Sequence, residues 1–184
     1  MLVIIWILIA VAAIIVLMFI TYFNKFVILG NRIDNSLSQI DVQLKKRADL
    51  IPNLIETVKG YAKHEKGIME KVTEARKAMM GAKDLVGRMK AGNVLESALG
   101  KLFAIAENYP QLKANENFLQ LQSELSAIED KIAYARQYYN DSTLSYNNSV
   151  QTFPGTLFAS LFGKKQKEYL KMPEVQKAVP KVSF

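Results

Sequence analysis

The sequence predicts an all-α protein, in which an N-terminal transmembrane helix is followed by an antiparallel up-and-down four-helix bundle with long, partly kinked helices. Two observations carry this prediction. An uncharged apolar stretch opens the chain, and two long segments behind it repeat apolar residues at steps of three and four. No segment alternates apolar and polar residues between hairpin turns, as a half-buried strand does. Helices with one apolar stripe bury it against one another, and short connections favour antiparallel neighbours.

Residues 1–24 form the predicted membrane anchor. No charged side chain precedes Lys25, and the stretch is long enough to cross a hydrocarbon core of roughly 30 Å as a helix. Trp6 and Tyr22 lie towards its ends, where aromatic side chains prefer the headgroup layer. A cleavable signal peptide is the alternative, because residues 10–12 imitate a cleavage site, but no basic side chain precedes the apolar run. We therefore expect a retained anchor.

The charge pattern favours one orientation in the membrane. Basic side chains follow the apolar stretch and none precedes it, which favours an N-terminus outside and a bundle on the cytoplasmic side of the cell (inner) membrane. The net charge is +7, but acidic and basic residues are interleaved, as on a solvated helical face. The chain has no cysteine, which excludes disulfides, thiolate metal sites and cysteine nucleophiles. We expect a single-pass membrane protein whose first partner is the lipid bilayer.

The longest helical pattern runs from Ile33 to Met79, and it resembles the seam of a coiled coil. Pro52 lies beside the seam, and the register continues across it. We therefore expect one helix that bends at Pro52, and the alternative is a turn at which Pro52 begins a second helix. The seam consists of Ile33, Leu37, Ile40, Leu44, Arg47, Ile51, Leu54, Val58, Tyr61, Glu65, Ile68, Val72, Ala75 and Met79.

A second long pattern runs from Phe118 to Ser149, between Pro110 and Pro154, which mark its ends. Between the two long patterns, residues 94–106 form a shorter and broadly apolar predicted helix. The second pattern consists of Phe118, Leu121, Leu125, Ile128, Ile132, Ala135, Tyr139, Ser142, Tyr146 and Ser149.

Arg47 and Glu65 are the candidate polar positions of the first seam. An unpaired buried charge is costly, so each is expected to find a partner. They either fix the register of the bundle inside one chain or make polar contacts between copies of the chain. Because the first seam is longer than the helix expected to cover it, apolar surface remains for another copy, and we expect a homo-oligomer.

The predicted domain order is an anchor (1–24), a bundle domain (25–150) and an amphipathic, basic tail (151–184). Apolar residues followed by cations can lie in a bilayer interface and attract anionic lipid. The alternative is that the same side chains cap the open end of the bundle. The candidate membrane-interface residues are Phe153, Leu157, Phe158, Leu161, Phe162, Lys164, Lys165 and Lys167.

No catalytic, cofactor-binding or metal-binding constellation is expected. His64 is the one histidine of the chain, and Ile68 stands where a zinc-protease helix has its second histidine. Tyr139 and Tyr146 fall on the apolar seam rather than on a nucleic-acid-binding face. We therefore expect no enzyme, no cofactor, no small-molecule substrate and no nucleic acid as a partner.

Three stretches of the chain carry a family resemblance: NRIDNSLSQIDVQLKKRADLIPNLIETVKGYAKHEKGIMEKVTEAR (31–76), YPQLKANENFLQLQSELSAIEDKIAYARQYYNDSTLSYNNSVQTFPGTLFASLFG (109–163) and the closing VPKVSF. Through them the chain resembles the LemA family over nearly its whole length. Gly81–Gly100 has little signature, and Leu37 stands where relatives often carry an aromatic residue. The resemblance implies a bacterial or archaeal membrane-anchored protein with an antiparallel helical bundle, and it brings no established catalytic residue, substrate or cofactor.

The function expected from these features is that of a non-enzymatic membrane-anchored scaffold, which self-associates and organises partners or the membrane surface. The long seam and the apolar, basic tail motivate this expectation. The alternative is an adaptor that recruits a membrane-protein partner, such as an envelope quality-control protease or a signalling protein, through its charged outer face.

Overall fold

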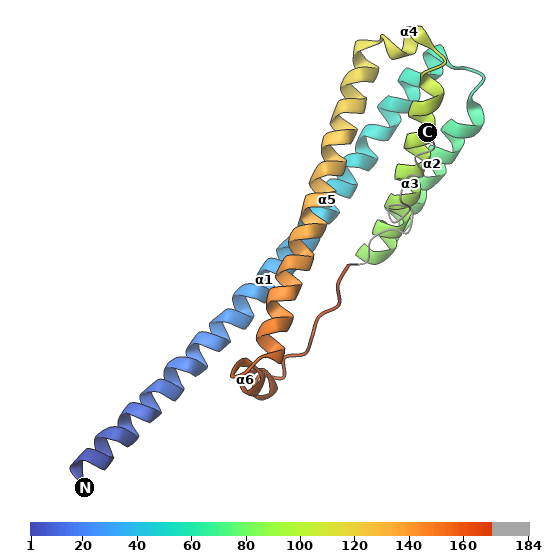
Figure 1. The fold of residues 1–184 in the computed structure, drawn as a ribbon. Helices are drawn as coiled ribbons and strands as arrows, with labels where there is room; N and C mark the ends of the chain where they lie inside the picture. Colours follow the sequence, from blue (N-terminus) through green and yellow to red (C-terminus); the bar gives the residue numbers. More distant parts are fainter. Residues whose placement is uncertain (171–184) are drawn as a thin grey trace, which may run out of the picture. The chain divides into compact units, whose positions relative to one another are not determined.

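The computed structural model describes residues 1–170, and this part of the chain contains helices and no strand (Figure 1). The all-α prediction is confirmed. One helix, α1, is long and apolar enough to cross a membrane, judged by length and composition. The closing VPKVSF and the end of the predicted tail lie outside the described residues. The helices are α1 (Leu2–Tyr61), α2 (Lys66–Gly81), α3 (Leu85–Ala106), α4 (Pro110–Lys113), α5 (Glu116–Gln151) and α6 (Gly155–Leu161).

The chain divides into two compact units, and α1 and α5 each contribute residues to both. The first unit comprises residues 1–36 and 137–170. It holds the beginning of α1, the end of α5, α6 and the extended segment that follows α6. The second unit comprises residues 37–136. It holds the rest of α1 and α5 together with α2, α3 and α4.

In the second unit α1 and α5 run antiparallel. Arg47 in α1 forms an ion pair with Glu129 in α5. Further along α1, the Tyr61 hydroxyl accepts a hydrogen bond from the side chain of Asn115, just before α5, at 3.1 Å. The contact positions rise along one helix as they fall along the other, so the two helices point in opposite directions.

Helices α2 and α3 of this unit also run antiparallel to a neighbouring helix. Phe103 of α3 packs edge-to-face on Phe118 of α5 with ring centroids 5.9 Å apart, and Asn93 of α3 pairs with Arg136 of α5. Helix α2 returns along α1, because Arg76 donates to the main chain of α1. The four segments α1, α2, α3 and α5 therefore form the antiparallel up-and-down bundle that the sequence predicts.

The core of this bundle is built from the predicted seams. Fully burying such an aliphatic side chain contributes roughly 1.5–3 kcal/mol, so the seams supply the main driving force for packing. The predicted seam residues that are buried in this unit are Ile40, Leu44, Arg47, Ile51, Leu54, Val58, Val72, Ala75, Met79, Phe118, Leu125, Ile128, Ile132 and Ala135.

The prediction of one helical rod from Ile33 to Met79 is wrong at one turn. Helix α1 ends at Tyr61 and α2 begins at Lys66, and in the turn between them the Glu65 amide donates to the Ala62 carbonyl at 3.1 Å. The turn keeps the count of threes and fours in step, because Glu65 lies four positions after Tyr61, the last seam position of α1. A periodicity count cannot distinguish such a turn from another turn of helix.

Pro52 lies inside α1 and does not divide it, as expected. Side-chain caps mark the beginnings of α3 and α5. The Asp84 carboxylate accepts a hydrogen bond from the Gly87 amide at 2.6 Å, and the Asn115 side chain accepts one from the Phe118 amide at 3.0 Å. Both caps satisfy main-chain donors that a helix N-terminus leaves unpaired.

In the first unit, α1 changes character along its length. Residues 2–17 are exposed on every side of the helix, although nearly all of them are apolar. From Phe26 onward, one face is buried: Phe26 is 2% exposed, and its ring packs edge-to-face on Tyr146 of α5 with centroids 6.0 Å apart. The packing of this unit therefore begins within the last turns of the apolar stretch and continues beyond it.

Candidate functional site

Arg47 lies inside the bundle, where it is 3% exposed. Its guanidinium pairs with Glu129 of α5 and donates to the Gly92 carbonyl of α3 at 3.5 Å. A Cβ at position 92 would lie 2.9 Å from Leu44 Cδ2, so glycine allows α3 to approach α1 closely. The structure thus gives Arg47 partners on two other helices of its own chain.

Arg47 belongs to a larger polar set, because each of the four long helices contributes one arginine that contacts another helix. We call Arg47, Arg76, Arg88 and Arg136 the arginine belt. The further contacts are Arg76 Nε to the Ala48 carbonyl (2.7 Å), Arg88 with Asp41, and Arg136 Nη2 to Asn93 Oδ1 (2.9 Å). The belt joins all four helices through polar side chains as well as through apolar packing.

The surroundings of the belt lower the pKa of two of its arginines, which nevertheless keep their positive charge. Burial lowers the pKa of Arg47 to about 10, which the negative charge of Glu96 opposes and the positive charge of Arg136 reinforces. Burial also lowers the pKa of Arg136, again against the influence of Glu96. Both guanidinium groups remain charged at neutral pH, so they cannot exchange protons there. The belt is suited to holding helices in register rather than to acid–base chemistry.

Glu65, the second predicted polar position, lies away from Arg47 in the turn before α2. Its carboxylate accepts a hydrogen bond from the Tyr109 hydroxyl at 3.0 Å, which joins this turn to the connection between α3 and α4. That hydrogen bond is the main cause of a raised pKa of the Tyr109 phenol. Glu65 therefore connects two turns at one end of the bundle.

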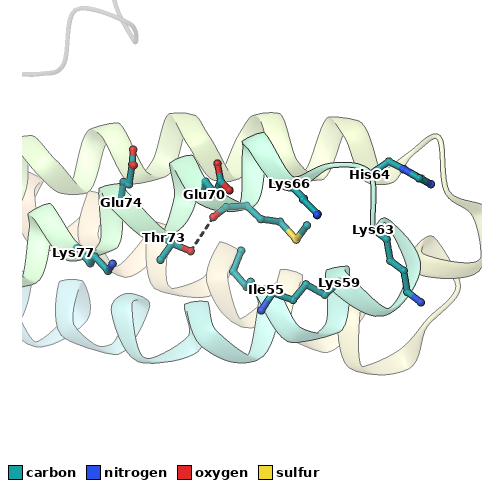
Figure 2. Close-up of a pocket in the computed structure, with 10 residues that line it drawn as sticks. Ile55, Lys59, Lys63, His64, Lys66, Glu70, Thr73, Glu74 and Lys77 are labelled. Carbon is teal, nitrogen blue, oxygen red and sulfur yellow. Dashed lines mark hydrogen bonds between the residues drawn. The ribbon is translucent and has the colours of Figure 1, made fainter.

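An open groove of about 810 Å³ lies beside the same turn, between α1 and α2 (Figure 2). Its apolar part consists of Ile55 and Met69, both nearly buried. Figure 2 shows Glu70, Thr73 and Glu74 along α2 and His64 in the turn. The cationic lining residues are Lys59, Lys63, Lys66 and Lys77.

The chemistry of this basic groove is electrostatic. Four lysines and two glutamates, Glu70 and Glu74, line the groove, so its lining carries an excess of positive charge. Lys59 also pairs with Glu56 at 2.8 Å. In residues 1–170 no group of three or more His, Asp or Glu side chains comes together that could hold a metal ion. The positive charge of the groove favours contact with anionic groups.

The predicted membrane-interface residues form two groups, and the first packs inward. Phe158 of α6 stacks on Tyr22 of α1 with centroids 5.0 Å apart, and Phe162 lies edge-to-face on Phe19 at 4.8 Å. A Cβ at Gly155 would lie 2.1 Å from the Ser149 carbonyl oxygen and 3.0 Å from the Tyr22 ring, so only glycine permits this approach. These contacts attach α6 to the last residues of the apolar stretch of α1.

The second group faces outward. Phe153, Leu157 and Leu161 are 81%, 61% and 68% exposed. The three lysines follow α6, and Lys165 is exposed, whereas Lys167 pairs with Asp34 at 3.5 Å. The tail therefore has an aromatic face against α1 and an exposed apolar face.

Sequence reasoning missed Asn140 and Asn147 of α5, whose side-chain amides bind the extended segment after α6. Asn147 is 3% exposed. The available signal was their spacing of seven residues, each directly after a seam tyrosine, Tyr139 or Tyr146. Asparagine is rarely buried without a partner, so this repeat indicates a polar contact on that side of α5.

Comparison with known proteins adds the family. The model of the LemA family matches residues 36–184. The magnetosome protein MamQ of Magnetospirillum gryphiswaldense is 26% identical over 173 residues, covering 80% of this chain and 64% of the relative. Protein LemA of Metamycoplasma hominis is 29% identical over 124 residues, covering 67% of this chain and 57% of the relative. The matched region is thus less than two thirds of the length of these relatives.

Proposed function

Because the chain belongs to the LemA family, we propose that it is a non-enzymatic membrane-anchored helical scaffold, which self-associates and organises partners or the membrane surface. The observation that carries this proposal is α1. Its first residues expose apolar side chains on every side of the helix, which is typical of a membrane span. The later part of the same helix, Leu37 to Tyr61, is one of the four helices of the bundle. Basic residues after the span favour the cell (inner) membrane with the N-terminus outside and the bundle cytoplasmic.

The tail supports a role at the membrane surface. Helix α6 packs on Phe19, Tyr22 and Phe23. These residues lie at the end of the apolar stretch, shortly before Lys25. With the stretch in the hydrocarbon, α6 lies at the bilayer interface. Its exposed apolar face then enters the headgroup region, and Lys165 meets anionic lipid.

The support for self-association is an apolar groove between α2 and α3, with a volume of about 610 Å³. It is lined by Ile68, Ala78, Val94 and Ala98 among others, with Lys71 and Lys101 also lining it. Val94 is 61% exposed, and a partner seated in the groove would bury this side chain together with the apolar lining. A second copy of the chain is the proposed cover.

The test measures the mass of full-length protein in detergent across a range of concentrations, by mass photometry. We expect an oligomer, and we expect Val94→Glu to shift it towards the monomer. Val86→Glu is the matched control, because Val86 is 58% exposed on the same helix but does not line the groove. A wild-type protein that remains monomeric at every concentration would refute self-association.

The basic groove between α1 and α2 favours a second candidate function, that of an adaptor. Its excess of lysines suits an acidic segment of another membrane protein. Crosslinking in intact cells followed by mass spectrometry separates the two functions. One dominant heterologous partner that is lost in Lys63→Glu, Lys66→Glu protein and retained in Lys131→Glu protein supports the adaptor, and links mainly between copies support the scaffold. Lys131 is an exposed lysine of α5 outside the groove.

A further inference from the structure

Residues 164–170 form an extended segment after α6, and two asparagines of α5 bind its main chain. Asn147 donates to the Lys167 carbonyl and accepts from the Lys167 amide, both at 2.9 Å. Asn140 binds Leu170 in the same way, at 3.2 Å and 2.9 Å. The Tyr139 hydroxyl donates to the Glu168 carbonyl at 2.9 Å. Each asparagine thus replaces the pair of hydrogen bonds that a neighbouring β-strand would make.

The two pairs fit because the helix and the extended segment have matching lengths. Seven residues of α-helix rise about 10.5 Å, and three residues of extended chain span about 10 Å. Asn140 and Asn147 are seven residues apart, and their partners Leu170 and Lys167 are three apart. The surface around these two asparagines, which we call the asparagine pair, therefore recognises an extended backbone that runs antiparallel to α5.

Side-chain recognition adds one feature. The Lys167 ammonium lies 3.5 Å from the Asp34 carboxylate and 5.7 Å from the centroid of the Tyr146 ring. Neighbouring side chains of the segment, including Lys165, Glu168 and Tyr169, are exposed. The segment is thus held by main-chain hydrogen bonds and one lysine, with little apolar burial. Such segments open at a lower free-energy cost than the core of a fold.

Gly163 provides the hinge for this segment. Its φ is +62°, the one positive φ recorded in the described part of the chain, and it stands between Phe162 and the extended residues. A side chain at position 163 would be strained in that conformation, whereas glycine can also adopt others. A change of conformation at Gly163 would redirect residues 164–170 while Phe158 and Phe162 stay on α1, at the cost of the 2.8 Å hydrogen bond from the Lys164 amide to the Ala159 carbonyl.

We infer that residues 164–170 exchange between copies, so that the segment of one copy docks on the asparagine pair of the next. The inference rests on the proposed self-association and supplies its connecting contact. An identical segment from a neighbour makes the same main-chain hydrogen bonds and brings the same lysine to Asp34. Copies anchored in one membrane face the same way, so the exchange runs head to tail and closes as a ring or continues as a row.

The test uses the absence of native cysteine in the full-length chain. One tagged copy carries Leu144→Cys, and a differently tagged copy carries Glu168→Cys. Leu144 is exposed and lies on α5 between the two asparagines, three and four residues from them, so both asparagines remain intact. The two copies are co-expressed in membranes and treated with a short thiol-reactive crosslinker. Exchange predicts a product that carries both tags.

Ser145→Cys paired with Glu168→Cys is the control, because Ser145 is exposed but turned away from the asparagine side of α5. Exchange predicts at least about a tenfold excess of the Leu144→Cys product over this control, since the asparagine pair orients the segment. If the product does not exceed the control while mass photometry still finds an oligomer, exchange is refuted and the scaffold stands. If the protein is monomeric, self-association and exchange both fail.

A second variant tests the asparagines directly. In Asn140→Asp, Asn147→Asp protein, a carboxylate oxygen replaces the amide donor at each position and faces a carbonyl of the segment, so assembly is expected to weaken by about fivefold or more. Asn148→Asp is the matched control, an exposed asparagine one residue further along α5. Unchanged assembly in the double variant would overturn the inference.

Discussion

The ion pair between Arg47 and Glu129 joins α1 to α5 inside the four-helix unit. Arg47 is buried, whereas the Glu129 side chain is 29% exposed, so the carboxylate reaches inward from the margin of the bundle. The guanidinium also contacts the Gly92 carbonyl, which brings α3 into the same contact. The Arg47 side chain thus connects three helices, and a substitution of Glu129 tests how much this connection stabilises the bundle.

Glu129→Gln removes that counter-charge and leaves the Arg47 guanidinium buried. Breaking a buried ion pair from one side is strongly destabilising, so we expect a loss of about 2–4 kcal/mol in the free energy of unfolding. Denaturant unfolding of the full-length protein in detergent, followed by circular dichroism, measures it. Asp130→Asn is the control on the neighbouring exposed position, with a change within about 0.5 kcal/mol.

The doubly substituted Arg47→Leu, Glu129→Leu protein should recover most of the stability lost in Glu129→Gln protein, because apolar replacements remove both charges together. If Glu129→Gln protein unfolds at the wild-type denaturant concentration, the ion pair does not stabilise the bundle.

Gly155→Ala should detach α6 from α1. The added Cβ would lie 2.1 Å from the main-chain oxygen of Ser149, which cannot move aside as a flexible side chain can. We expect faster cleavage after Phe153 or Leu157 in limited proteolysis, by about tenfold, since detachment exposes the helix to the protease. Gly100→Ala is the control: a Cβ there meets nothing within 4 Å, and alanine should stabilise α3 by roughly 0.5–1 kcal/mol. Equal cleavage of both variants would contradict the packing of α6.

The hydrogen bond between Tyr109 and Glu65 predicts a pH dependence. It raises the pKa of the Tyr109 phenol in the folded protein above its usual value of about 10. The stability that it contributes is therefore complete below about pH 10 and is lost as the pH rises through the folded-state pKa. Glu65→Gln should lower the pKa of Tyr109, which ultraviolet titration detects as the difference from the same protein carrying Tyr109→Phe. An unchanged titration would mean that Glu65 does not determine the acidity of Tyr109.

The exposed face of α6 predicts contact with lipid. In a Trp6→Phe background the chain has no other tryptophan, so Leu157→Trp reports from α6 alone. Its fluorescence should be quenched by brominated lipid and should shift to shorter wavelength, because the indole ring enters the interface. Leu119→Trp, at an exposed position of α5 in the bundle, is the control and should not be quenched. Equal quenching at both positions, or at neither, would contradict interfacial placement of α6.

The elements of the fold were predictable because apolar periodicity carries them. The helix through Pro52 and the bundle core follow from that periodicity, and the buried Ile51, Leu54 and Ile132 lie on the predicted seams. The reversal before α2 was not predictable in this way, because its four residues have the length of one helical turn. Chain reversal depends on which surface the next helix covers, and that is a tertiary property.

The candidate sites were predictable only in part. Charge in an apolar seam singled out Arg47, but its partner Glu129 lies far away in the sequence, and only packing brings the two together. Glu65 lies in a turn at the end of the bundle, and its partner Tyr109 is also distant in the sequence. The asparagine pair was not predicted, because it binds the main chain of residues 167 and 170. Any residue other than proline has these main-chain groups, so the bound segment carries no sequence motif for the contact.

The arginine belt also has a mechanical consequence. Sliding α1 by a single turn, about 5.4 Å, would carry Arg47, which is 3% exposed, past Glu129 and leave its charge buried without its partner. The contact of Arg88 with Asp41 is partly exposed and adds less to this penalty. The buried arginine of the belt therefore opposes a piston-like displacement of α1 along the bundle.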